Sequence, residues 1–259
     1  MFRRVGRNLA LTDAGQLLKT PVGDALDRVL EGVDRVRECS GTQLLTVSVP
    51  PSFGAKWLMP RLEHFREQCP EVEVRIDASM RLVDLNHEGI DLAIRDGTGH
   101  YPGLEVECLM SDQVFPVCSP ALLRRDTSLI TPADLAMHTL IHTESSGSDN
   151  AYPDWPMWLR AVGLPNLPAL HDLRISLPSM AGDAALAGQG VVLPGRVLLT
   201  EDLKHARLVR LFDTCVTSEC RYYLMHPRRR APSPALTRFM DWLHSEASSG
   251  LDTCEPQRP

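Results

Sequence analysis

Residues 46–60 read Thr46-Val-Ser-Val-Pro-Pro-Ser-Phe-Gly-Ala-Lys-Trp-Leu-Met-Pro60, and this stretch decides the fold of the 259-residue chain. Leu45, Val47 and Val49 alternate with polar residues as in a strand, which the two prolines then end. Ser52 stands where a helix N-cap is expected. A strand that leads into a helix start is typical of binding corners in α/β sheets, because the first amides of a helix are unpaired. The alternative is an ordinary strand–helix unit without a ligand.

Predicted strands and helices alternate downstream of this stretch. Leu58, Leu62, Phe65 and Cys69 have the spacing of a core-facing helix. The order predicts an α/β, doubly wound fold with parallel strands, in which two similar halves face each other across a cleft. In the first half we expect strands at 72–76, 92–95 and 114–118 and a short helix at 82–88. Later we expect strands at 139–142, 173–176, 191–193 and 222–225, and helices at 155–162, 179–187 and 234–245.

Composition excludes several classes of protein. The net charge of -6 argues against coating nucleic acid by bulk charge, so any DNA contact must be local. No signal peptide is visible and no apolar run approaches the ~18 residues of a membrane span, which predicts a cytoplasmic protein without a membrane partner. The seven cysteines and nine histidines show no C-x-x-C or H-E-x-x-H spacing. We therefore expect no metal and no cofactor.

The N-terminal region carries a heptad pattern. Thr12-Asp13-Ala14-Gly15 has the signals of a helix start, and polar residues separate the apolar ones that follow. A narrow apolar stripe on a helix whose other faces are polar favours self-association through that helix. Packing of the helix on its own domain is the alternative. The stripe consists of Val22, Leu26, Val29, Val33 and Val36, spaced 4, 3, 4, 3.

Together these segments resemble a LysR-type transcriptional regulator over nearly the whole chain. Phe2-x-Arg4-x-Gly6-Arg7-x-Leu9-x-Leu11-Thr12-x-Ala14-Gly15 is similar to the end of the family's winged helix-turn-helix. Six further motifs resemble the subgroup of the family that is related to the glycine cleavage activator. They are Arg81-Leu-Val-Asp84, Glu88-Gly-Ile-Asp-Leu-Ala-Ile-Arg95, Pro102-Gly-Leu-Glu105, Phe115-Pro-Val-Cys-Ser-Pro120, Ala184-Ala-Leu-Ala-Gly-Gln-Gly190 and Trp242-Leu243.

The resemblance implies a two-lobed, periplasmic-binding-protein-like effector domain behind a dimerisation helix. It implies control of transcription by a small polar or carboxylate effector in the interlobe cleft, with DNA and further copies of the chain, as dimer or tetramer, as partners. The expected parts are the wing remnant 1–12, the dimerisation helix 13–39, subdomain I at 44–117 and 222–246, subdomain II at 118–221, and a flexible tail at 247–259.

The N-terminus departs from the family pattern. Met1 stands where the family usually has Leu, so the chain is expected to begin inside the DNA-binding domain. Either the true start lies upstream, or this form lacks base readout, since a helix-turn-helix needs its second helix in the major groove. Arg3, Arg4 and Arg7 would then contact the DNA backbone.

The resemblance also implies the effector-binding residues. Each has a plain alternative: Ser52 and Ser176 as helix caps, Asp84 as a cap or ion-pair partner, His142 as a solvated strand end, and Tyr222 as core. The implied set is Ser52, Phe53, Gly54, Asp84, His142, Thr143, Ser176 and Tyr222.

Two other functions compete with a regulator. A solute-binding protein has a similar two-lobed fold, but the export signal is missing and a heptad helix would have no use. An enzyme is disfavoured because no P-loop, G-x-S-x-G elbow or G-x-G-x-x-G motif follows a predicted strand. Gly188-Gln-Gly190 comes before a predicted strand, which is the wrong order for such a motif. We therefore expect a regulator that is not an enzyme.

Overall fold

The computed structural model describes residues 1–6, 8–39, 43–85, 88–125, 129–143, 152–228 and 231–249. The chain divides into two compact units. The first contains residues 1–44 and 71–73, and the second contains residues 45–70 and 74–259.

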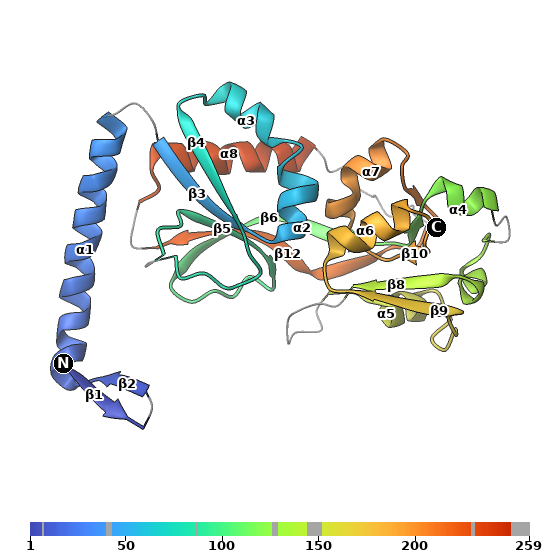
Figure 1. The fold of residues 1–259 in the computed structure, drawn as a ribbon, viewed down its shortest axis with the longest axis horizontal. Helices are drawn as coiled ribbons and strands as arrows, with labels where there is room; N and C mark the ends of the chain where they lie inside the picture. Colours follow the sequence, from blue (N-terminus) through green and yellow to red (C-terminus); the bar gives the residue numbers. More distant parts are fainter. Residues whose placement is uncertain are drawn as a thin grey trace. The chain divides into compact units, whose positions relative to one another are not determined.

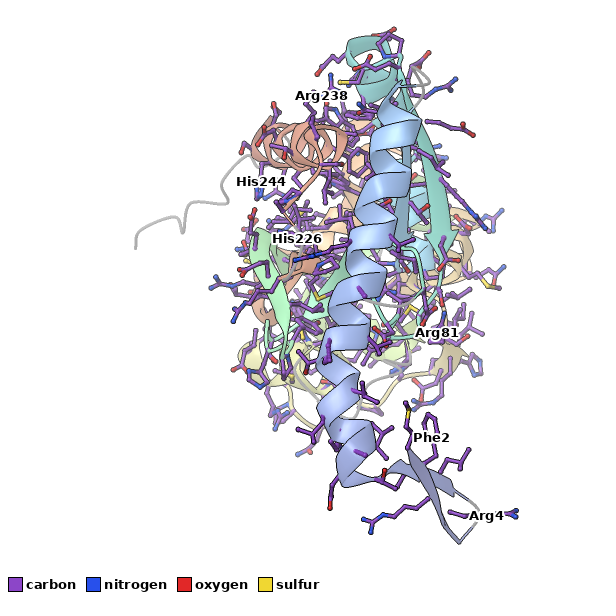
Figure 2. All side chains as sticks on the ribbon, turned by 90° about the vertical axis from the view of Figure 1, so that its left-hand side faces the viewer. Phe2, Arg4, Arg81, His226, Arg238 and His244 are labelled. Atoms are coloured by element: carbon purple, nitrogen blue, oxygen red, sulfur yellow. The ribbon has the colours of Figure 1, made fainter. Side chains whose placement is uncertain are left out.

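The first unit is a hairpin followed by one long helix (Figure 1). Strands β1 (Phe2–Val5) and β2 (Asn8–Leu11) pair antiparallel. The turn between them uses Gly6 at φ +62°, a conformation that glycine adopts without strain. Helix α1 (Asp13–Cys39) spans the predicted heptad region, and Thr12 caps it by accepting a hydrogen bond from the Gly15 amide. In Figure 2 the side chain of Arg4 points away from the hairpin.

The second unit contains two lobes, each built on a five-stranded sheet, except for the first two residues of β3 and of β4, which are counted with the first unit. In lobe I the strand order is β4-β3-β5-β12-β6, and Phe65 packs edge-on against Phe239 with ring centroids 4.9 Å apart. Strands β3 and β5 are parallel, whereas β12 runs antiparallel to both β5 and β6. The strands are β3 (Gln43–Val49), β4 (Val72–Ala78), β5 (Leu92–Gly97), β6 (Leu104–Val114) and β12 (Val216–Pro227). The helices are α2 (Pro51–Phe53), the π-helix η1 (Gly54–Leu58), α3 (Leu62–Gln68) and α8 (Pro234–Ser249).

In lobe II the order is β11-β7-β10-β8-β9, with parallel pairs β10–β8 and β8–β9 and an antiparallel β7. One core cluster centres on Trp155 and Trp158, another on Ala181 and Leu199. The strands are β7 (Val117–Cys118), β8 (Thr139–Thr143), β9 (His171–Ile175), β10 (Val191–Val192) and β11 (Val209–Arg210). The helices are α4 (Pro120–Arg125), η2 (Pro132–Met137), α5 (Trp155–Ala161), α6 (Pro178–Leu186), η3 (Arg196–Leu199) and α7 (Thr200–Lys204).

The structure corrects several predicted elements. The sheets are mixed rather than parallel, because the chain returns to lobe I through β12. The predicted helix at 82–88 is wrong for its described residues, 82–85 and 88, which form a non-helical loop held by an ion pair between Arg81 and Glu88. The predicted strand at 114–118 is broken at Phe115-Pro116, and β6 before it was missed. Helix α8 continues past the predicted end, to Ser249, with Ala247 buried.

The expected helix start is also displaced. Pro50 is the N-cap of α2 and Pro51 its first residue, so Ser52 lies inside the helix rather than at its cap. A proline fits the first helical position because the amide it lacks would have no partner there. In the described ranges no helix is long and apolar enough to cross a membrane.

Candidate functional site

A cavity of about 650 Å³ lies between the two lobes. Lobe I contributes the corner after β3, the loop at 80–82, the end of β5 and the start of β12. Lobe II contributes the end of β8 and the corners before α6 and η3. The lining residues from lobe I are Pro50, Ser52, Phe53, Met80, Leu82, Arg95, Asp96, Gly97, Thr98, His100, Tyr101, Cys220 and Tyr222. Those from lobe II are Thr143, Tyr152, Ser176, Leu177, Pro178, Pro194, Gly195 and Leu198.

The structure brings part of the predicted set together. Ser52, Phe53, Thr143, Ser176 and Tyr222 all line the cavity. His142 is not among its lining residues, and its Nε2 lies 2.8 Å from Oδ1 of Asp172.

Gly54 and Asp84 also lie outside the cavity lining. The Gly54 amide donates to the Pro50 carbonyl at 2.9 Å, so it is not available to a ligand. The Asp84 amide and carbonyl both bond to Glu88 in the loop that replaces the predicted helix.

Ser52 bridges the lobes at the edge of the cavity. Its Oγ accepts a hydrogen bond from the Ser179 amide at 3.0 Å, and the two hydroxyl oxygens are 3.1 Å apart. Ser52 is buried, so its hydroxyl contacts neighbouring protein groups rather than bulk water. A serine hydroxyl can donate once and accept twice, so one lone pair of Ser52 is left for a further donor.

An aromatic wall lies beside Ser52. Phe53 is fully buried, stacks on Trp57 with centroids 5.0 Å apart, and lies 4.8 Å from the ring of Tyr222. Burial raises the pKa of Tyr222 well above its ordinary value, and the nearby carboxylates of Asp112 and Asp96 act in the same direction. The phenol therefore stays protonated at neutral pH and can donate a hydrogen bond.

Arg95 places a buried positive charge in the cavity wall. Its side chain is only 5% exposed, and its Nη atoms donate to the carbonyl oxygens of Ser48, Ile94 and Arg81 and to the Ser48 hydroxyl. Burial lowers its pKa, and in the described part of the chain its Nε has no hydrogen-bond partner. The oxygens that it bonds to are neutral, and the carboxylates of Asp96 and Asp77 act on the guanidinium without a hydrogen bond to it, raising its pKa against the effect of burial. Sequence reasoning missed Arg95, although a charge that ends the apolar run Leu92-Ala-Ile was a visible signal.

A buried carboxylate supports the opposite wall. Tyr152 donates to Asp112 Oδ2 at 2.9 Å, while Asp112 Oδ1 accepts from the amides of Val197 and Gln113 at 3.1 and 2.8 Å. Burial raises the Asp112 pKa from 3.8 to about 6. Gly195 passes so close that an added Cβ would lie 2.0 Å from both Asp112 Oδ2 and the Tyr152 hydroxyl, so only glycine fits.

This arrangement is suited to binding a small polar molecule. Hydroxyls from both lobes can donate or accept, the aromatic wall excludes water, and Arg95 favours a negative group. Asp96, which is exposed on the same wall, can accept from a positive group. No cluster of His, Cys, Asp or Glu suited to a metal ion occurs among the described residues.

Comparison with known proteins identifies the family. A family model described as the LysR substrate binding domain matches residues 40–248. The chain belongs to the LysR family of transcriptional regulators. It is 34% identical over 249 residues to the glycine cleavage system transcriptional activator of Escherichia coli K12, covering 96% of this chain and 80% of that protein. It is 32% identical over 248 residues to the activator AmpR of Rhodobacter capsulatus, covering 96% and 82%.

Solved LysR structures share the fold. The effector domain of AmpR from Pseudomonas aeruginosa has a TM-score of 0.65 and 30% identity, covering 80% of this chain and 96% of that one. CrgA from Neisseria meningitidis has a TM-score of 0.65 over 95% of this chain and 83% of its own, and at 21% identity it supports the fold alone. The predicted LysR regulator with a two-lobed effector domain is thus confirmed, and the solute-binding alternative is not favoured. The relatives named here are regulators of transcription rather than enzymes.

Proposed function

We propose that this LysR regulator senses a small polar or carboxylate metabolite in the cavity between its lobes and controls transcription in response. The observation that carries the proposal is that Ser52, Thr143, Ser176 and Tyr222, drawn from both lobes, line one cavity whose wall contains buried Arg95. A ligand that contacts both lobes favours the lobe arrangement in which all its contacts form.

The charge of Arg95 selects for anions without touching them. Its Nη groups are already engaged and its Nε is buried, so a carboxylate would take its hydrogen bonds from hydroxyls such as Tyr222. Asp96 and Asp77 offset part of this charge, and the remainder acts over several ångströms because the surrounding dielectric constant is low. The effector therefore carries at least one carboxylate or comparable acceptor group.

We also propose a homodimer through α1. Val22 and Val29 lie seven residues apart on this 27-residue helix and are 50% and 61% exposed, as a seam without its partner helix would be. Leu26, Val33 and Val36 complete the proposed seam, but their side chains lie outside the described set. A tetramer would need a second interface.

DNA is the proposed macromolecular partner. Arg3 and Arg4 are exposed on the hairpin, and their guanidinium groups suit phosphate oxygens. Arg7, expected to act with them, lies outside the described residues. A regulator of transcription in bacteria works in the cytoplasm, which is the location we propose.

Calorimetry on paired variants tests the effector site. Once a thermal-shift screen of carboxylates and amino acids has found a ligand, Ser52→Ala is expected to weaken binding several-fold to roughly a hundredfold, because one hydrogen bond is worth about 1 kcal/mol and up to about 3 for a charged group. His142→Ala is the matched control and should leave the affinity unchanged, since His142 does not line the cavity. Unchanged affinity in both Ser52→Ala and Ser176→Ala would place the ligand elsewhere.

A further inference from the structure

Three residues from one segment of lobe I make polar contacts with lobe II. Ser52 bonds to Ser179 of α6, as described above. The Lys56 ammonium lies 2.7 Å from Asp183 Oδ1, also on α6. Arg61 Nη2 lies 3.1 Å from Glu201 Oε1 on α7. All three lobe I residues come from the eleven positions 51–61, which contain α2, η1 and the turn after them.

The π-helical turn explains why these side chains face one way. In η1 the Met59 amide donates to the Gly54 carbonyl at 2.9 Å, a bond between residues five apart. Such a turn holds more residues than an α-helical turn, so side chains four or five positions apart fall on the same side. On α6 the partners Ser179 and Asp183 are four apart, which also places them on one face.

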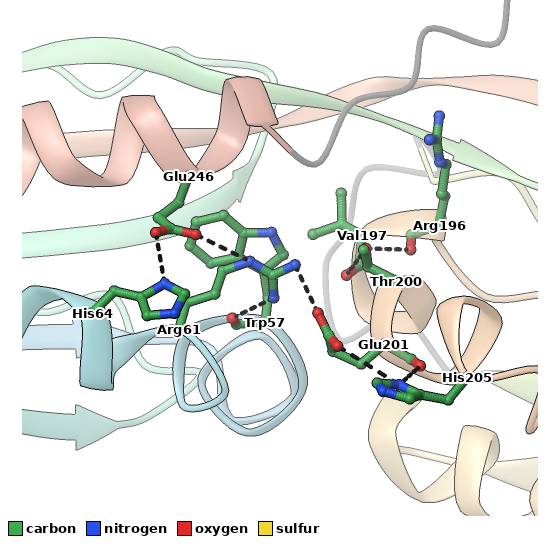
Figure 3. Close-up of polar contacts among 9 residues, drawn as sticks. All are labelled: Trp57, Arg61, His64, Arg196, Val197, Thr200, Glu201, His205 and Glu246. Atoms are coloured by element: carbon green, nitrogen blue, oxygen red, sulfur yellow. Dashed lines mark hydrogen bonds and ion pairs between the residues drawn. The ribbon is translucent and has the colours of Figure 1, made fainter.

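Arg61 is anchored in lobe I and reaches across with one nitrogen. It is buried, and its guanidinium carbon Cζ lies over the Trp57 ring, 5.0 Å from the ring centroid. Its Nη1 donates a hydrogen bond to the Trp57 carbonyl at 3.0 Å. Its Nε lies 3.8 Å from Glu246 on α8. Figure 3 shows the guanidinium between Glu246 of lobe I and Glu201 of lobe II. Separation of the lobes would therefore break the Glu201 contact alone and leave Arg61 in place.

We propose that Ser52, Lys56 and Arg61 form an interlobe latch with Ser179, Asp183 and Glu201, and that this latch sets the balance between closed and open lobes of the sensing cavity. The latch deepens the proposed function because Ser52 belongs to both. Its single hydroxyl proton can go either to Ser179 or to an effector, so an effector that accepts from Ser52 requires the Ser179 hydroxyl to turn and donate to the remaining lone pair of Ser52. The latch residues are thus positioning residues for effector binding.

Amide hydrogen exchange of Ser179 measures latch opening directly, because the acceptor of this amide is Ser52 across the cleft. The experiment uses the full chain without any added ligand, followed by NMR. Asp183→Asn removes the charge that pairs with Lys56, although Lys56 keeps the more distant Asp202 at 3.7 Å. The lysine side chain is 21% exposed and the aspartate 62%, so the pair is partly screened by water. Ser179 exchange is expected to accelerate about two- to fivefold, the range for such pairs.

Three controls separate the latch from general destabilisation. Asp183→Glu keeps the charge, so the Ser179 amide of this variant should exchange at close to the parent rate. Glu105→Gln breaks an exposed ion pair inside lobe I, in which Glu105 lies 2.9 Å from Arg228. This variant should leave the exchange rate of the Ser179 amide unchanged. The Ala187 amide, which donates to the Asp183 carbonyl, reports on α6 itself and should not accelerate.

The proposal is overturned if Ser179 exchange in Asp183→Asn equals that of the parent, or if Ala187 accelerates by the same factor, which would mean that α6 frays. Equal acceleration in Glu105→Gln also overturns it. Because no effector is present, a wrong assignment of the effector site leaves this result untouched, and calorimetry on Ser176→Ala, at a cavity residue outside the latch, tests that assignment separately.

Discussion

Replacing Asp112 by asparagine is expected to remove a pH dependence of stability. The folded chain holds the Asp112 pKa at about 6 against 3.8 for the ordinary carboxyl, because burial disfavours the charged form. The folded state therefore binds more protons than the unfolded state between these values, and stability is lost as the pH rises through them. The full loss is about 3 kcal/mol, of which about 2 falls between pH 4.5 and 7.5.

An asparagine side chain should fit the same site. Its carbonyl oxygen can accept from the Val197 and Gln113 amides, and its NH₂ can donate to the Tyr152 oxygen, which reverses the direction of that bond. The amide has no charge to bury, so the variant lacks the loss of stability at higher pH. At pH 7.5 we expect Asp112→Asn to be more stable than the parent by as much as about 3 kcal/mol.

Denaturant unfolding followed by tryptophan fluorescence measures this difference. All four tryptophans, Trp57, Trp155, Trp158 and Trp242, belong to the second unit, where Asp112 lies. The free energy of unfolding of the parent minus that of Asp112→Asn should fall by about 2 kcal/mol between pH 4.5 and 7.5. Asp241→Asn, at an exposed position on α8, is the control and should give a flat difference. A flat or rising difference for Asp112→Asn would refute the reasoning, since a rise is the behaviour of a carboxylate stabilised by its surroundings.

Three further predictions concern other parts of the chain. Gly195→Ala should destabilise the second unit by about 1–3 kcal/mol, because its Cβ would displace the Tyr152–Asp112 contact. Gly182→Ala is the control and should be tolerated, because its Cβ would meet nothing closer than 3.9 Å, and equal unfolding midpoints for the two variants would contradict this prediction. Val22→Asp with Val29→Asp should lower the mass found by light scattering toward the monomer, and an unchanged mass would exclude the α1 seam. Arg3→Ala with Arg4→Ala should weaken DNA binding about equally across sequences and reduce the slope of log affinity against log salt by about 2; an unchanged slope would remove both from the DNA contact.

Local patterns predicted the elements that depend on local sequence. Alternation located β3, and a short apolar run located β5, because each strand buries its apolar residues in one core. Strand β6 was missed although Leu104-Glu105-Val106-Glu107-Cys108 alternates apolar and charged residues, which is a strand signal. The antiparallel return of β12 depends on pairing with β5 and β6, which are distant in sequence.

The site shows the same division. Residues at element corners, such as Ser52 and Ser176, could be assigned from the family resemblance. Thr143 and His142 were both assigned, yet consecutive residues of a strand point to opposite faces, and only Thr143 lines the cavity. Tyr152 was missed because tertiary packing, rather than a motif, brings it to the cavity, whereas Arg95 was missed although it ends a family motif and follows an apolar run.

A crystal structure of the chain with the effector found by screening tests the central claim most directly. The account predicts electron density for the ligand in the cavity between the lobes, with an acceptor group within hydrogen-bond distance of Ser52 or Tyr222 and contacts to Thr143 or Ser176 of lobe II. Density for the ligand outside this cavity, or contacts confined to one lobe, would contradict it.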